Sequence, residues 1–173
     1  MMLAAPILII ATGGMICERS GVTNVGLDGL MSIGACTAAI VHQLMEAAGV
    51  GRISLTVALL AAALVSMLIS VLHAIASVDL KSDQTISGTG INLLATGITV
   101  FVCQRIYGTD RSTEFKMGMV KDGLGFYPTL YIAIVVVVLA WFILYKTPFG
   151  MHLRACGEHP AAADSVGINV RRI

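Results

Sequence analysis

Residues 53–76 read ISLTVALLAAALVSMLISVLHAIA, and this stretch decides the fold class. It carries no formal charge, and His73 is its one strongly polar side chain. Because an α-helix rises about 1.5 Å per residue, about 20 apolar residues cross the hydrocarbon core of a bilayer. The stretch is long enough to do so, and Ser54 is expected to cap its start. We therefore predict a membrane-spanning helix.

The composition of the whole chain agrees with a membrane protein. Hydrophobic residues make up 57% of the 173 residues, charged residues make up 12%, and the mean hydropathy is +0.88. A soluble domain carries about 25% charged residues, twice this share. The net charge of +1 gives no reason to expect a nucleic-acid partner. The predicted fold is an all-α, polytopic bundle of transmembrane helices.

Four further apolar segments complete the predicted bundle. We expect about five membrane helices, at residues 1–16, 25–45, 53–76, 84–103 and 129–145. The first is short, and Gly13-Gly14 weakens its end. In the second, Asn24 can cap the helix and Asp28 lies in the first turn, where the helix dipole favours negative charge. A tight polar loop is expected at 77–83, after the third helix.

The fifth segment contains a β-branched run, VVVV at 135–138, that also suits a strand. Its apolar length favours a helix, because every backbone polar group inside a bilayer must be paired. Pro128 and Lys146 bound this helix. Beyond it, residues 146–173 are amphipathic and partly charged.

Two short helices are predicted in this tail. Thr147 can cap the first, with Pro148 at the first helical position, and this helix is expected to end at Gly157. The second begins at Pro160 and stops at Gly167, which can take the left-handed conformation. A helix of about two turns is not stable alone in water, so it must pack against something.

Two Gly-rich polar segments are candidates for a transport pathway. The segment ERSGVTNVGLDG (18–29) is either an aqueous turn before a closely packed helix or a discontinuous helix start that faces a polar ligand. The segment QTISGTGINL (84–93) is either a small-residue packing interface or an uncharged polar lining for a solute that carries hydroxyl and amide groups. The candidate pathway residues are Asn24, Ser87, Thr89 and Asn92.

The sequence gives no support for catalysis. It contains no nucleophile–base spacing, no phosphate-binding GxxxxGK[ST] and no zinc signature, so no catalytic or metal-binding residue and no cofactor is predicted. His73 is expected to hydrogen-bond a neighbouring helix rather than to relay protons.

Three ordered motifs carry a resemblance to a known family. They are ERSGVTNVGLDGLMSIGA (18–35), DQTISGTGINLLATGIT (83–99) and TPFGMHLRACGEHPAAADSVGINV (147–170). Together they resemble the inner-membrane permease subunits of bacterial ABC importers for branched-chain amino acids, ribose-type sugars and nucleosides. The nucleoside or simple-sugar group is the most similar. The resemblance covers nearly the whole chain.

The resemblance implies a transport subunit without its own ATPase site, so that ATP is used by a separate partner. The implied partners are a cytoplasmic ABC ATPase, a second permease subunit, an extracytoplasmic substrate-binding protein and membrane lipid. The protein would be a multi-pass protein of the bacterial inner membrane, with residues 146–173 in the cytoplasm. Such permeases continue with further spans, so the chain is expected to be a truncated product or a fragment.

The resemblance also implies an element that couples the permease to the ATPase. The family pattern is EAA, three residues and then Gly. Ala161 stands where the pattern has Glu, and Ala162, Ala163 and Gly167 match it. The expected coupling residues are Arg154, Glu158, Pro160, Ala161, Ala162, Ala163, Asp164 and Gly167.

The leading hypothesis is therefore an ABC-importer permease that moves nucleosides or related sugars by alternating access. A second hypothesis is a non-transporting membrane scaffold whose Gly-rich helices simply pack. A third is an ion-coupled secondary carrier, for which Asp28 is the candidate membrane carboxylate.

Overall fold

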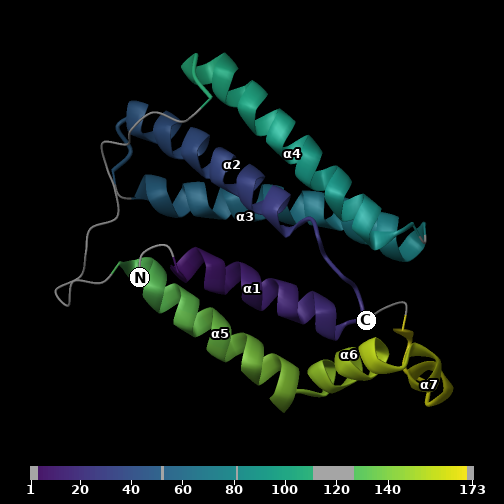
Figure 1. The fold of residues 1–173 in the computed structure, drawn as a ribbon. Helices are drawn as coiled ribbons and strands as arrows, with labels where there is room; N and C mark the ends of the chain where they lie inside the picture. The colour runs from purple at the N-terminus through teal and green to yellow at the C-terminus, as the bar shows by residue number, and fades with distance from the viewer. Residues whose placement is uncertain (1–3, 52, 81, 111–126, 171–173) are drawn as a thin grey trace. The chain divides into compact units, whose positions relative to one another are not determined.

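The computed structural model describes residues 4–51, 53–80, 82–110 and 127–170, and all regular structure in these residues is helical. The elements are α1 (Ala4–Arg19), α2 (Leu27–Ala47), α3 (Ile53–Ala74), η1 (Ile75–Asp79), α4 (Gln84–Tyr107), α5 (Pro128–Lys146), α6 (Pro148–Glu158) and α7 (Pro160–Ser165) (Figure 1). The chain forms two compact units. One is built on α2, α3 and α4, and the other combines α1 with α5, α6 and α7.

Four helices in the described residues are long and apolar enough to cross a membrane: Leu27–Ala47, Ile53–Asp79, Gln84–Tyr107 and Pro128–Lys146. Helix α1 has 16 described residues, which at about 1.5 Å each give a length of roughly 24 Å. That is less than the hydrocarbon thickness of about 30 Å. The predicted bundle of transmembrane helices, including the helix at 135–138, is confirmed, and the membrane span at 1–16 stays a prediction.

The start of α2 differs from the sequence-based expectation. Gly26 occupies the N-cap position and no side chain accepts a cap hydrogen bond there, so the prediction that Asn24 caps this helix is wrong. Asp28 does lie in the first turn. Local sequence could not identify the partner of this helix start, because that partner is Asn92 on α4.

The start and the end of the third span also differ from the sequence-based prediction. Ser54 is not an N-cap: it lies within α3, fully buried, and its amide donates to the Gly51 carbonyl at 2.9 Å. Instead of a loop beginning at residue 77, the chain continues as the π-helix η1 to Asp79. The Leu80 amide donates a hydrogen bond to the Ile75 carbonyl, five residues earlier, at 3.0 Å. The predicted polar loop is therefore shorter than expected.

Both ends of α4 are capped by residue types that commonly cap helices, Asp83 at the start and Gly108 at the end. The Asp83 carboxylate accepts hydrogen bonds from the amides of Thr85 at 2.8 Å and Ile86 at 3.1 Å. At the other end, Gly108 has a φ of 69°, the left-handed conformation that favours glycine. Helix α4 therefore extends beyond the predicted 84–103, to Tyr107, and residues 111–126 lie outside the described residues.

The remaining boundaries follow the predictions closely. Helix α1 runs through Gly13-Gly14 to Arg19, because packing on α5 overrides the weak helix propensity of glycine. Helix α5 begins at Pro128 and ends at Lys146, as predicted. Helix α6 ends one residue after the predicted Gly157.

Helices α2 and α4 approach each other through glycines. A Cβ atom on Gly88 of α4 would lie 2.8 Å from the Gly26 amide nitrogen and 3.0 Å from the Val25 Cβ. A Cβ atom on Gly29 of α2 would lie 2.8 Å from the Asn92 Oδ1. The two distances of 2.8 Å are shorter than a Cβ atom tolerates. The packing interpretation of residues 84–93 is therefore confirmed, and a pathway role for the same segment stays a prediction.

The close approach predicts opposite effects for two substitutions in one helix. Gly88→Ala should lower the free energy of unfolding by about 1–2 kcal/mol, because overpacking costs about 1–3 kcal/mol and exceeds the gain in helix propensity. Gly90→Ala is the matched control. No atom lies within 4 Å of a Cβ at Gly90, so stability should stay equal or rise by up to about 1 kcal/mol. Thermal unfolding in detergent measures both, and equal effects would contradict the packing described.

Candidate functional site

Asn92 joins α4 to the start of α2 with both ends of its carboxamide. Its Oδ1 accepts the Gly29 amide at 2.7 Å, and its Nδ2 donates to the Val25 carbonyl at 2.9 Å. The Gly29 amide is one of the first amides of α2, which have no partner within their own helix. Asn92 therefore takes the place of an N-cap and fixes the polar start of α2 against α4.

Ser87, one turn before Asn92 on α4, contacts His73 at the end of α3. The Ser87 Oγ and the His73 Nδ1 lie 3.0 Å apart, at hydrogen-bond distance. His73 is buried, with 4% of its surface exposed. The prediction that His73 hydrogen-bonds a neighbouring helix is confirmed. The pair is a polar contact that joins α3 to α4.

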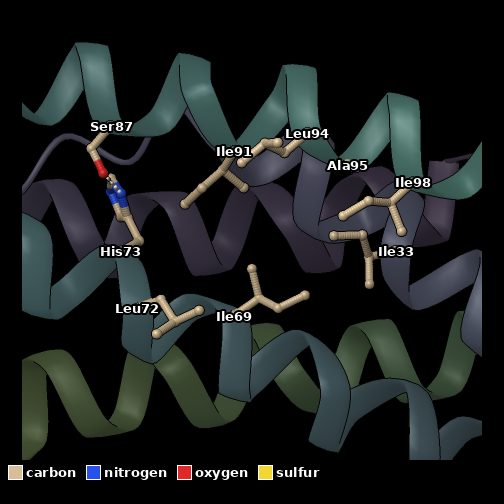
Figure 2. Close-up of a pocket in the computed structure, with 9 residues that line it drawn as sticks. All are labelled: Ile33, Ile69, Leu72, His73, Ser87, Ile91, Leu94, Ala95 and Ile98. Atoms are coloured by element: carbon tan, nitrogen blue, oxygen red, sulfur yellow. Dashed lines mark hydrogen bonds between the residues drawn. The ribbon is translucent and has the colours of Figure 1, made fainter.

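A cavity of about 290 Å³ lies beside this pair, among α2, α3 and α4 (Figure 2). It is lined by Ile33, Ile69, Leu72, His73, Ser87, Ile91, Leu94, Ala95 and Ile98. The lining is aliphatic except for His73 and Ser87, which lie together in Figure 2. No ionised carboxylate, lysine or arginine is among these residues, so the cavity suits an uncharged group.

The four predicted pathway residues fall in different surroundings. Ser87 lines the cavity, whereas Asn92 is occupied with the backbone of α2. Thr89 is exposed, and its hydroxyl donates to the Thr85 carbonyl of its own helix at 2.6 Å. Asn24 is half-buried and belongs to the other unit. The structure thus brings Ser87 and Asn92 onto neighbouring turns of α4, and the pathway role of all four stays a prediction.

Sequence reasoning missed the aliphatic lining of the cavity. Ile69 and Ile91 are ordinary residues of membrane helices, and no local signal distinguishes them from side chains that face lipid. Only the position of His73 and Ser87 near a helix end and a helix start hinted at a contact between α3 and α4.

In the other unit, α6 is fixed at both ends by glycines. Thr147 Oγ1 accepts the Gly150 amide at 3.2 Å, so the predicted cap is confirmed. A Cβ atom on Gly150 would overlap the backbone carbonyls at the end of α5. A Cβ atom on Gly157 would overlap the Arg19 carbonyl at the end of α1 and lie 3.0 Å from the Gly21 nitrogen. Helix α6 is therefore seated directly on the backbones of α5 and α1.

The predicted coupling residues of α7 divide into a buried residue and an exposed surface. Ala163 is buried, with 4% of its surface exposed. The exposed residues are Pro160, Ala161, Ala162, Asp164 and Gly167. Gly167 has a φ of 86°, which confirms the predicted left-handed conformation. Sequence reasoning missed Val166, an apolar side chain that is 74% exposed beside these residues.

Arg154 and Glu158, the coupling residues predicted on α6, have different environments. Arg154 is half-buried: its guanidinium carbon lies 4.9 Å from the centre of the Tyr145 ring, and its Nε donates to the Gly150 carbonyl at 3.4 Å. Glu158 is exposed at the end of α6. The structure therefore places Arg154 against α5 and leaves Glu158 open to solvent beside α7.

These features define the class of a polytopic helical membrane protein whose terminal short helices are held rigidly on its membrane helices. Residues 1–173 match the family described as the permease component of the branched-chain amino acid transport system, and the chain belongs to this permease family. With four helices in the described residues that are able to cross a membrane, it is a multi-pass protein of the inner membrane and a transport component.

Two curated relatives are named as nucleoside permeases. The guanosine ABC transporter permease protein NupQ of Bacillus subtilis (strain 168) is 43% identical over 98% of this chain and 58% of NupQ. The nucleoside ABC transporter permease protein NupC of Lactococcus lactis subsp. cremoris (strain MG1363) is 36% identical over 96% of this chain and 57% of NupC. The chain thus spans a little over half the length of these relatives. No solved structure gives a significant match.

The Asn92 bridge predicts that an isosteric change destabilises the protein. In Asn92→Asp, a carboxylate oxygen replaces the donor that faces the Val25 carbonyl, so one hydrogen bond is lost and two oxygens face each other. We expect a loss of about 1–3 kcal/mol in unfolding free energy and faster hydrogen exchange of the Gly29 amide. Thr89→Ala is the control, because its hydroxyl bonds only its own helix, and it should change stability by less than about 0.5 kcal/mol.

Proposed function

We propose that the chain is part of the permease subunit of an ATP-driven ABC importer that translocates nucleosides or related sugars. The observation that carries the proposal is the match to NupQ, a guanosine permease, over 98% of this chain. The uncharged lining of the cavity on α2, α3 and α4 supports a neutral solute, since a charged ligand would require a buried counter-charge.

The proposed assembly has three protein partners. A cytoplasmic ABC ATPase hydrolyses ATP, a second permease subunit completes the membrane pathway as a heterodimer, and an extracytoplasmic binding protein delivers the substrate. ATP is then a ligand of the partner and not of this chain. In this arrangement residues 146–173 face the cytoplasm, where the exposed residues of α7 are available to the ATPase.

The seating of α6 supports a lever mechanism for coupling. Helix α7 packs on α6, and α6 is fixed on α5 and α1 by Gly150 and Gly157. A displacement of α7 by the ATPase is therefore transmitted to two membrane helices rather than absorbed by a flexible joint. Such coupling needs two arrangements of the membrane helices that the ATPase binds with different affinity.

The pathway is proposed to use neutral polar groups of the Gly-rich segments. Ser87 and Asn92 lie on neighbouring turns of α4, and Thr89 and Asn24 are the further candidates. The hydroxyl groups of Ser87 and Thr89 can donate and accept hydrogen bonds with a nucleoside without introducing a buried charge, while the carboxamide of Asn92 holds the neighbouring start of α2 in place. The binding protein is expected to select the substrate.

Cysteine crosslinking tests the proposed contact with the ATPase. In the full-length complex, Ala162→Cys should crosslink to the ATPase subunit, because Ala162 is exposed on α7. Ala163→Cys is the matched control, since Ala163 is buried and should react far less. The products are identified by mass spectrometry. If Ala162→Cys captures no ATPase while the complex remains assembled, the coupling role of α7 is wrong.

Vesicle uptake distinguishes the importer from an ion-coupled carrier. Vesicles that contain the full-length permease, its ATPase and its binding protein should accumulate guanosine only with ATP, and collapse of the proton gradient should leave uptake unchanged. Asp28→Asn should also leave uptake within about twofold. Asp28 is exposed in the first turn of α2, where the interaction of its charge with the helix dipole stabilises the protein by less than about 1 kcal/mol. Loss of uptake in Asp28→Asn without loss of assembly would favour the carrier.

A further inference from the structure

Two cations near the end of α5 lie over aromatic rings. The Lys146 Nζ is 5.6 Å from the centre of the Trp141 ring, and the Arg154 Cζ is 4.9 Å from the centre of the Tyr145 ring. Both distances lie within the range of cation–π contacts. Neither contact is part of the lever mechanism proposed above.

The two rings belong to one face of α5. Trp141 and Tyr145 are four residues apart, so their side chains are neighbours along the helix. Both rings are partly exposed, Trp141 at 51% and Tyr145 at 43%. The two contacts therefore place the ammonium of Lys146 and the guanidinium of Arg154 along a single aromatic stripe.

Among the described residues, these two charges have no counter-charge. In the part of the chain that the structure describes, neither Lys146 nor Arg154 forms an ion pair, and the one polar bond of Arg154 goes to the Gly150 carbonyl. Glu158 stands one turn after Arg154 on α6 and does not pair with it in these residues. Two neighbouring cations without a carboxylate favour an anionic partner from outside the chain.

The position of the stripe indicates what that partner is. Helix α5 is long and apolar enough to cross a membrane and ends at Lys146, so Lys146 lies where the hydrocarbon core ends. Trp and Tyr are typical of this boundary, at the level of the lipid head groups. Phe149, the second residue of α6 and three residues after Lys146, is 54% exposed and offers a contact for acyl chains. Phosphate oxygens of lipids are the anions found at this depth.

We propose that Lys146 and Arg154, held over Trp141 and Tyr145, bind the phosphate of an anionic phospholipid. The rings occupy one face of each cation, and its remaining N–H groups are available to phosphate oxygens. A zwitterionic lipid compensates its own phosphate with a choline, so an anionic lipid is preferred. The site gives Arg154 a role at the membrane boundary instead of the ATPase contact that the family resemblance suggested.

Lipid binding to the full-length permease tests the site by native mass spectrometry. The delipidated protein is titrated with phosphatidylglycerol and with phosphatidylcholine of the same chain length. The wild type should prefer phosphatidylglycerol, and Lys146→Gln with Arg154→Gln should weaken its binding roughly 25-fold, about fivefold for each cation near an anionic surface. Lys146→Arg with Arg154→Lys keeps both charges and should retain most of the binding. Added salt should weaken the wild type and leave the double Gln variant unchanged.

The matched control is Arg105→Gln, which removes an exposed cation from the last turn of α4. It should leave the preference for phosphatidylglycerol intact. An unchanged preference in the double Gln variant, equal binding of both lipids by the wild type, or full competition by soluble glycerol phosphate would overturn the proposal. If the double variant does not fold, Arg154→Gln alone carries the test with an expected fivefold loss. The measurement needs no transport, so it is independent of the importer function.

Discussion

Helix α2 begins with backbone amides that its own turns cannot satisfy, and the amide of Gly29 is one of them. The carboxamide of Asn92 supplies an acceptor for Gly29 and a donor for Val25. This bridge requires the backbones of α2 and α4 to lie so close that Gly29 and Gly88 have no room for a Cβ atom. The glycines in both segments are thus a consequence of one side-chain amide that satisfies a helix start.

The second unit uses glycine for a different purpose. At Gly150 and Gly157 the backbone of α6 touches carbonyl groups of α5 and α1, and no side chain lies between them. Direct backbone contact gives a stiffer joint than contact through long, flexible side chains, which change rotamer easily. Stiffness at this place is useful only if force arrives through α7, which agrees with a permease driven by a separate motor.

Hydropathy and local cap chemistry predicted most of the helices. The bilayer requires long apolar helices, so the spans could be read from composition, and Thr147, Pro148 and Gly167 act within a few residues of their own positions. The errors at Asn24 and Ser54 arose because their surroundings are set by other helices. The partner of Gly29 is 63 residues away, a separation that no local pattern encodes.

The candidate site was less predictable than the fold. The ordered motifs identified the permease family and the Gly-rich segments, and Ser87 proved to line a cavity. The isoleucines and leucines that form most of its wall look like any other residue of a membrane helix. The π-helical turn η1, which continues α3 and contacts α4, likewise carries no distinctive signal in its sequence.

The partners of α1 have a consequence for how the protein is made. Helix α1 contacts α5 and α6, and its end at Arg19 meets Gly157, so these neighbours are synthesised only after α2, α3 and α4. Helices α2, α3 and α4 contact one another and can assemble as soon as they are synthesised. Helix α1 therefore waits in the insertion machinery or at the head groups until α5 and α6 are translated, and premature termination before α5 would leave it without these partners and open to quality-control proteases.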